Sequence, residues 1–182
     1  AQDISSGAAT LNITNFSRLP SLAAPGSYHR VQASTTLAGI SNVNSSNYSV
    51  SAGNATQSIV VLPGESHTEG ASSLAAALGG APTDQTAGSS FSVSVRAVDD
   101  WFNIDSDHSG AVSISSSDPY DTHPVTPTAF TSGVADFLIT NRTSTPTATA
   151  LLTPSSPLTT NNGSNAYKID PGSASQTLVY FS

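Results

Sequence analysis

The feature of this sequence that most constrains its fold is an internal repeat. Residues 46–62 align without a gap with residues 165–181, at a constant offset (172 − 53 = 119). The identical positions include Tyr48 with Tyr167, Gly53 with Gly172, Gln57 with Gln176 and Val60 with Val179. A repeat of this kind predicts that the same supersecondary unit is built twice from different parts of the chain.

A second match lies upstream of the first. Residues 7–15 (GAATLNITN) are similar to residues 133–141 (GVADFLITN), at a slightly different offset (133 − 7 = 126). Residues 63–132 have no partner in the N-terminal part. The simplest interpretation is one complete repeat over 63–182, preceded by the back half of another.

Alternation of apolar and polar residues predicts strands throughout the chain. The clearest case is 90–97, where Phe91, Val93 and Val95 alternate with serines. Further strands are expected at residues 8–16, 28–35, 48–50, 59–62, 111–115, 134–140, 147–153, 166–169 and 175–182. Short strands separated by turn signals predict an all-β sandwich.

The repeat also predicts a domain division. We expect residues 1–62 to be a partial β-domain holding the late strands of a repeat, and 63–182 to be a complete sandwich. Residues 63–88 begin with Pro-Gly-Glu and are rich in Gly, Ala, Ser and Thr, so they are expected to include the linker. Within them, residues 73–79 are expected to form a helical turn or an edge strand.

Composition excludes several classes of function. Only 9% of residues are charged and the net charge is −7, so no basic stripe exists to neutralise phosphates, and nucleic acid binding is not expected. No apolar stretch approaches the ~20 residues that a membrane-spanning helix needs. The chain has no cysteine, which favours a prokaryotic surface protein over a eukaryotic secreted domain. No catalytic motif is present, so the chain is not expected to be an enzyme.

The stretch from Phe91 to Pro119 resembles the Ig-like repeats of large bacterial surface proteins. The resemblance lies in an alternating strand that ends in Val98-Asp99, a loop containing Asn103, then Gly110-Ala111-Val112, and a turn of sequence Ser-Ser-Asp-Pro at 116–119. The strand followed by Leu-Pro-Gly-Glu at 62–65 is similar to the join between such repeats. The resemblance implies an Ig-like β-sandwich, but it implies no activity.

The loop after this strand is a candidate calcium site. Calcium prefers several oxygen ligands, and this loop is rich in Asp and Asn, although the same residues also simply favour turns. The candidate ligands are Asp100, Asn103, Asp105 and Asp107. No other cofactor is expected.

Seven Asn-x-Ser/Thr sequons predict an exported glycoprotein that carries covalent glycans, unless the matches follow only from the abundance of Ser and Thr. They are Asn12, Asn15, Asn44, Asn47, Asn54, Asn141 and Asn162. Attached sugars would supply the solubility that the scarce charge does not. The expected location is extracellular, at the cell surface.

The incomplete first copy carries the functional hypothesis. Half a sandwich cannot bury its apolar face, so three explanations are open. The chain belongs to a longer array; residues 1–62 fold onto the complete domain or close by themselves with Ser5–Ala9 as an extra strand; or another copy supplies the missing strands. Strand donation between copies gives a head-to-tail contact that does not close, and therefore a homopolymeric filament or surface layer. The expected assembly residues are Leu11, Ile13, Leu178 and Val179.

Two alternative functions are open. One is a passive spacer of a large adhesin or secreted enzyme. The other is a carbohydrate-binding module that stacks sugars on Trp101 and Phe102, although one of these two residues is expected to cap the core and not to bind a ligand.

Overall fold

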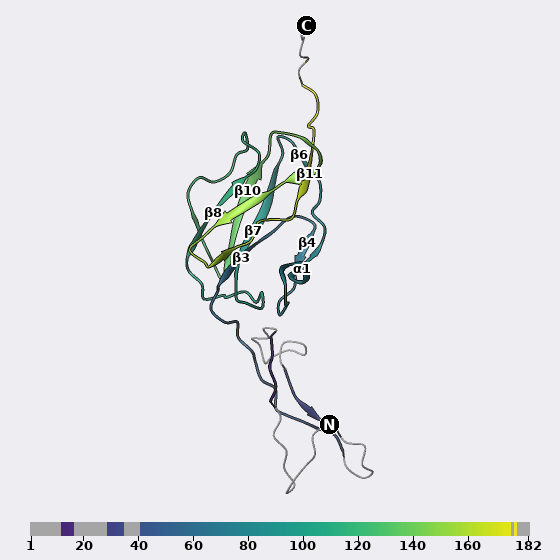
Figure 1. The fold of residues 1–182 in the computed structure, drawn as a ribbon, viewed down its shortest axis with the longest axis vertical. Helices are drawn as coiled ribbons and strands as arrows, with labels where there is room; N and C mark the ends of the chain where they lie inside the picture. Colours follow the sequence, from purple (N-terminus) through teal and green to yellow (C-terminus); the bar gives the residue numbers. More distant parts are fainter. Residues whose placement is uncertain (1–11, 17–28, 35–40, 176, 178–182) are drawn as a thin grey trace. The chain divides into compact units, whose positions relative to one another are not determined.

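The computed structural model describes residues 12–16, 29–34, 41–175 and 177, and it divides into two compact units. Unit 1 covers residues 1–51 and unit 2 covers residues 52–182. Both are built of short strands, and unit 2 is a two-layered sandwich (Figure 1). The predicted all-β sandwich class is confirmed.

The first layer of unit 2 is a four-stranded sheet in the order β10-β7-β3-β13. The central strand β7 (Ser90–Val98) pairs antiparallel with β10 (Val134–Thr140) on one side and with β3 (Gln57–Val61) on the other. A short parallel strand, β13 (Thr160–Asn161), lies on the outer edge of β3. The strict alternation of β7 places its apolar side chains on the face that looks into the sandwich.

The second layer consists of two three-stranded sheets. In the first sheet, β8 (Ala111–Ser116) lies between β12 (Leu152–Ser155) and β9 (Thr128–Ala129). In the second sheet, β14 (Tyr167–Asp170) lies between β11 (Thr145–Ala150) and β6 (Gln85–Thr86). Apolar side chains from both layers meet in one core. Its buried members include Val60, Phe91, Val93, Val95, Val112, Ile114, Phe130, Phe137, Ile139, Leu152, Tyr167 and Ile169.

Strand β3 is buried on both of its faces. Val60 and Leu62 belong to the main core, whereas Ile59 and Val61 belong to a second cluster on the outer side of the sheet. That second cluster is covered by an excursion of the chain through β4 (Glu65–His67), α1 (Leu74–Ala77) and β5 (Leu78–Gly80). Burial on both faces explains why β3 is a continuous apolar run instead of an alternating one.

The predicted domain boundary after residue 62 is wrong, because β3 is an integral strand of unit 2 and the division falls between Ser51 and Ala52. Residues 63–88 are likewise folded parts of the sandwich and not a linker. At 73–79 the chain forms both expected alternatives in succession, a helical turn capped by Ser73 and then a strand. Among the described residues, no helix has the length and apolar character to cross a membrane.

The Leu-Pro-Gly-Glu segment is a tight turn at the end of β3. The Glu65 side chain accepts a hydrogen bond from the Leu62 backbone N–H (2.8 Å), and the Glu65 N–H donates to the Leu62 carbonyl (3.0 Å). Gly64 has φ +91°, and a Cβ there would lie 2.5 Å from the Ala81 carbonyl oxygen. The glycine is therefore required by both the backbone conformation and the close approach.

In unit 1, the described residues form a small antiparallel arrangement. Strand β1 (Gln32–Ala33) pairs with β2 (Val43–Asn44), and His29 bridges Tyr48 through two backbone hydrogen bonds of 2.9 Å each. The rings of His29 and Tyr48 are stacked, with centroids 5.8 Å apart.

Candidate functional site

The Asp-rich loop that follows β7 forms hydrogen bonds to residues 53–56, the segment immediately before β3. The Asp99 carboxylate is buried and accepts hydrogen bonds through Oδ1 from the N–H groups of Trp101 and Asn103, each at 2.9 Å. Through Oδ2 it accepts from the N–H of Gly53, also at 2.9 Å. The loop geometry and the incoming chain are thus fixed by one side chain.

Two further aspartates extend this contact, which we call the aspartate clamp (Asp99, Asp100 and Asp105). Asp105 Oδ2 accepts from the Ala55 N–H at 2.9 Å, and Asp100 Oδ1 accepts from the Thr56 hydroxyl at 2.6 Å. Hydrogen bonds to charged acceptors are stronger than neutral ones. The clamp therefore immobilises residues 53–56 immediately before β3 begins.

The aspartate clamp includes two of the four residues that the sequence predicts as calcium ligands, Asp100 and Asp105. Of the four candidate ligands, Asp100 and Asp105 accept hydrogen bonds from the incoming chain, and Asn103 donates its amide to Asp99 at 3.0 Å. Asp107 is exposed. Within the described part of the chain, no three His, Cys, Asp or Glu side chains are grouped so that they could hold a metal ion. Calcium binding stays a prediction, and the hydrogen bonds account for Asp100, Asn103 and Asp105 without it.

The chain leaves the sandwich beside residues that precede β7. The Ala87 N–H donates to the Asp170 carbonyl at 2.8 Å, and a Cβ added to Gly172 would lie 2.8 Å from the Ala87 carbonyl oxygen. Asp99 directly follows β7, and Ala87 lies shortly before it. Residues 53–56 and 170–172 therefore lie at opposite ends of β7, the longest described strand of unit 2 (Figure 1), which spans roughly 30 Å.

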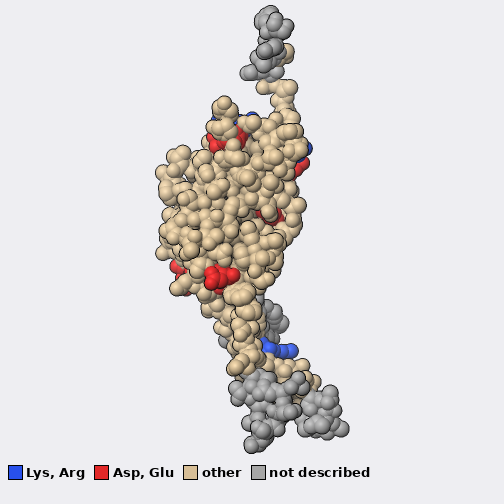
Figure 2. Space-filling model, in the orientation of Figure 1, with Lys and Arg blue, Asp and Glu red and all other residues tan. Residues whose placement is uncertain are grey.

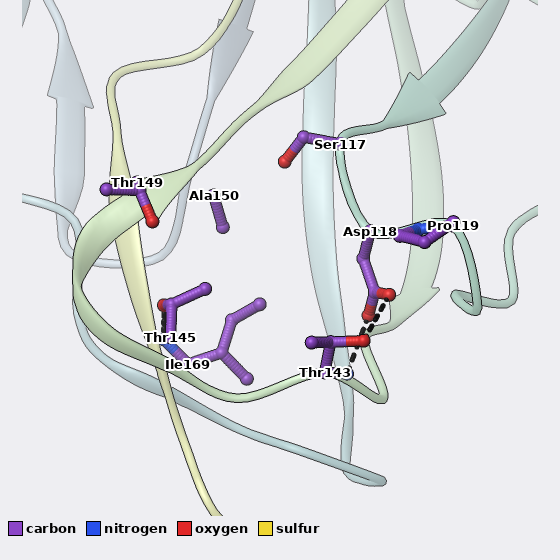
Figure 3. Close-up of a pocket in the computed structure, with 8 residues that line it drawn as sticks. All are labelled: Ser117, Asp118, Pro119, Thr143, Thr145, Thr149, Ala150 and Ile169. Carbon is purple, nitrogen blue, oxygen red and sulfur yellow. Dashed lines mark hydrogen bonds between the residues drawn. The ribbon is translucent and has the colours of Figure 1, made fainter.

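A pocket of about 250 Å³ lies near the Ser-Ser-Asp-Pro turn (Figure 3). Asp118 Oδ2 accepts from the N–H groups of Arg142 (2.6 Å) and Thr143 (2.9 Å). Asp118 Oδ1 accepts from the Tyr120 N–H (3.0 Å) and the Thr143 hydroxyl (2.8 Å). Burial acts to raise the pKa of Asp118, but these four donors outweigh it and lower the pKa to about 2.

The other polar groups of this pocket are also engaged. The Thr145 hydroxyl accepts from the Ile169 N–H at 3.0 Å, and the Ser117 hydroxyl accepts from the Leu151 N–H at 3.0 Å. Figure 3 shows Asp118 turned toward Thr143, whose backbone N–H and hydroxyl both donate hydrogen bonds to the Asp118 carboxylate. The pocket is therefore a hydrogen-bonded corner that joins β8 to the segment after β10.

Next to this corner, two buried side chains, Tyr167 and Asn141, and the half-buried Ser116 are joined by hydrogen bonds. The Tyr167 hydroxyl donates to Asn141 Oδ1 at 2.8 Å, and Asn141 Nδ2 donates to the Ser116 hydroxyl at 3.1 Å. Burial raises the pKa of Tyr167 to about 12, against the smaller opposite effect of its hydrogen bonds to Asn141 and Ser116. The Tyr167 ring also packs edge-on against Phe91, with centroids 5.7 Å apart.

This arrangement corrects one predicted glycosylation position. Asn141 is 1% exposed and its amide nitrogen is hydrogen-bonded inside the core, so a glycan cannot be attached to it in the folded chain. Asn15 and Asn162 are half-buried, and each donates its amide nitrogen to another group. The sequons with exposed side chains are Asn12, Asn44, Asn47 and Asn54.

Unit 1 repeats three contacts of the sandwich, and each of them includes a residue that the sequence repeat equates with its counterpart. Asn15 Nδ2 donates to the Tyr48 hydroxyl at 3.2 Å, as the counterpart of the contact between Asn141 and Tyr167. Both tyrosines also pair with a residue earlier in the chain: Tyr48 forms an isolated bridge with His29, and Tyr167 of β14 pairs with Ala150 of β11.

The third repeated contact is a reciprocal pair of hydrogen bonds made by one serine. In unit 1, the Ser45 N–H donates to the Val31 carbonyl (2.8 Å), and the Val31 N–H donates to the Ser45 hydroxyl (2.9 Å). In the sandwich, Ser164 makes the same two bonds with Leu152, both at 2.9 Å. The described residues of unit 1 thus reproduce three local contacts that the sandwich makes between β10 and β14. Sequence reasoning found the repeat but missed these contacts, although the alignments pair Asn15 with Asn141 and extend to Ser45 and Ser164.

The structure also describes the two aromatic residues of the Asp-rich loop and one of the expected assembly residues. Trp101 is 37% exposed, whereas Phe102 is 5% exposed and packs in the second cluster, so Phe102 is the residue that caps the core. Ile13 is described and exposed; the other three expected assembly residues, Leu11, Leu178 and Val179, lie outside the described residues.

A scan against protein-family models found no family that matches this chain, and a search of curated proteins found no match either.

Proposed function

We propose that this chain is a non-catalytic structural protein of an extracellular, glycosylated filament or surface layer in which β-sandwiches follow one another head to tail. The observation that carries the proposal is the path of the chain through unit 2. It arrives beside Asp99 and departs beside Ala87, at opposite ends of β7. Modules in which the chain enters at one end and exits at the other form an array that becomes longer with each repeat, instead of folding back on itself.

The aspartate clamp supports a mechanical role for the joint. Three carboxylates bind the backbone or hydroxyl groups of residues 53–56 before the first strand. Such bonds restrict the hinge at which a preceding module would otherwise swing. A stiff joint suits a component that transmits tension along an array.

The sheet edges of unit 2 favour end-to-end over side-by-side association. Beyond β3, the Leu62 backbone groups are bonded to Glu65, which also accepts from the Asn165 amide at 2.6 Å. The outer edge of β10 is bridged at both ends, by Thr122 to Thr140 and by Thr131 to Val134. The exposed Asp136 lies between those bridges, and a charge on an edge strand opposes lateral pairing.

The sequence repeat supplies a route for head-to-tail contact. Residues 176–181 match β3 and the residue after it in sequence, and β3 is the strand that is buried on both faces. We propose that Leu178 and Val179 act as core residues of a first strand in a neighbouring sandwich. Leu11 and Ile13, which the repeat equates with Phe137 and Ile139 of β10, would act as core residues of a strand donated from the N-terminal part of the chain.

The surface of the sandwich is compatible with this role. On the face drawn in Figure 2, most of the surface carries no charge, and the acidic side chains lie in small separate groups. A glycan on Asn54, the exposed sequon asparagine of unit 2, would help to keep such a surface hydrated.

A passive spacer within a large adhesin is the second candidate, because unit 2 has a complete core and requires no other chain to close it. Light scattering after size exclusion separates the two candidates. A filament subunit is expected to form species whose mass grows with protein concentration, and deletion of residues 1–16 should abolish that growth if they are the donor strand. A constant monomer mass at millimolar concentration would contradict the filament and leave the spacer.

A further inference from the structure

The single tryptophan of the chain, Trp101, lies in the Asp-rich loop that follows β7. It is 37% exposed, although tryptophan side chains are highly buried on average. The next residue, Phe102, is buried and already caps the second cluster. Trp101 is therefore one of the large apolar side chains that the described part of the sandwich leaves in contact with solvent.

The aspartate clamp holds the exposed sequon asparagine Asn54 beside this tryptophan. The N–H groups of Gly53 and Trp101 donate to the two oxygens of the Asp99 carboxylate, each at 2.9 Å. The Thr56 hydroxyl donates at 2.6 Å to the carboxylate of the residue before Trp101. Asn54 therefore lies between two residues that are hydrogen-bonded to the segment containing Trp101, and its own backbone runs alongside that segment.

The direction of the Asn54 side chain follows from its neighbours. The N–H groups of Gly53 and Ala55, two residues apart, both donate to carboxylates of the loop, which is the pattern of an extended segment. Successive side chains of such a segment point to opposite sides. Ala55 packs against the main core, so Asn54 and Thr56 lie on the other side, where Thr56 contacts the loop. Asn54 is exposed on that same side.

We propose that the first sugar of a glycan on Asn54 packs against the indole ring of Trp101. The bond joins Asn54 Nδ2 to the anomeric carbon of a sugar carried on a diphosphate, which departs as the leaving group while the amide loses a proton. A pyranose ring has a face of C–H groups, which is attracted by the negative face of an aromatic ring. Because the clamp already fixes the backbone of the sequon, ordering the first sugar costs little further conformational entropy.

This proposal rests on the proposed function, because it requires a glycosylated chain, and it deepens that function by naming what the sugar contacts. The full chain is secreted from a eukaryotic host that attaches glycans through N-acetylglucosamine, and an endoglycosidase trims each glycan to this first sugar. Asn54→Gln supplies the same chain without a sugar at this position. The other sequons are unchanged in that variant, so the comparison isolates one sugar.

The fluorescence of the single tryptophan reports directly on the contact. Acrylamide should quench the fluorescence about twofold less in the glycosylated chain than in Asn54→Gln, because the sugar covers one face of the indole. In NMR spectra, the ring protons of one N-acetylglucosamine should be shifted upfield by the ring current of the indole. Those shifted signals should be missing from Asn54→Gln.

A double-mutant cycle tests whether the contact is specific to Trp101. The sugar on Asn54 should raise the melting temperature by about 2–4 °C. This increase should disappear in Trp101→Ala and persist in Tyr120→Ala, the matched control at another exposed aromatic side chain. The quenching and the NMR shifts are measured with Trp101 in place, so they do not depend on how well the Trp101 variant folds.

The contact would be overturned by an unoccupied Asn54, by equal quenching with and without the sugar, or by a rise in melting temperature that survives Trp101→Ala. Failure of the filament is distinguishable from these outcomes. A chain that shows the contact but stays monomeric would sustain the contact and contradict the filament. Fibres whose Asn54 carries no sugar would sustain the filament and contradict the contact.

Discussion

Asp118→Asn tests whether buried carboxylates at the loop corners stabilise the sandwich. The substitution keeps the shape of the side chain but removes the charge that receives four hydrogen bonds. The pKa of Asp118 lies at about 2, compared with 3.8 for an ordinary aspartate. A difference of nearly two pKa units corresponds to at most ~2.4 kcal/mol. Because the corner adjoins solvent, we expect about 1–2 kcal/mol.

The sign of the pH dependence follows from the lowered pKa. In the native chain, Asp118 binds its proton less readily than in the unfolded chain, so it contributes stability above pH ~4. That contribution is lost as the pH falls through about 4 to 2. The destabilisation caused by Asp118→Asn should therefore be about 1–2 kcal/mol larger at pH 7 than at pH 2.5.

Urea unfolding followed by the fluorescence of Trp101, the single tryptophan, measures this difference. Asp107→Asn is the matched control, because Asp107 is exposed. Its unfolding free energy should stay within about 0.5 kcal/mol of the native chain at both pH values. A destabilisation by Asp118→Asn that is the same at pH 7 and pH 2.5 would refute the electrostatic explanation of the corner.

Three further results are expected. Tyr167→Phe should lower the unfolding free energy by about 1–3 kcal/mol in the same urea titration, because the side-chain carbonyl of Asn141 loses its hydrogen-bond donor in the core. The control is Tyr120→Phe, at an exposed side chain, which should change the unfolding free energy by less than about 0.5 kcal/mol. Gly64→Ala should lower the melting temperature more than Gly88→Ala. Both glycines have a positive φ, but only at Gly64 would the new Cβ collide with a backbone oxygen, that of Ala81. Equal shifts in melting temperature would contradict the steric argument. Peptide mass spectrometry of the native protein should find Asn141 unmodified because its side chain is buried, and a glycan there would contradict that burial.

Much of the sandwich could be predicted from local patterns. Strict alternation located β7, and β8 and β10 followed from the same rule, because each of these strands has one face in the core. The burial of Phe91, Val93 and Val95 is the direct consequence of that alternation.

The domain boundary was not predictable in the same way. The run from Ile59 to Leu62 matches the last residues of the chain, which made it resemble the end of a repeat. In the fold it is the first strand of a sandwich, and the turn at Gly64 returns the chain to the same unit. Only the pairing of β3 with β7 distinguishes a strand that closes one module from a strand that opens the next.

The aspartate clamp depends on contacts that sequence spacing does not encode. Asp99 binds Gly53 and Asp105 binds Ala55, so each partner is far away along the chain. A cluster of Asp and Asn therefore predicted oxygen ligands for a cation, whereas the fold supplies backbone N–H donors. The pairing of Asn15 with Tyr48 did have a signal, because both matches of the repeat place the same two residue types in both copies.

Electron microscopy of the native material tests the central claim most directly. A head-to-tail array of these sandwiches predicts thin, unbranched fibres with an axial repeat on the order of 40 Å, from about 30 Å for β7 and a short connector. Isolated compact particles at every concentration, with no fibres, would contradict the account.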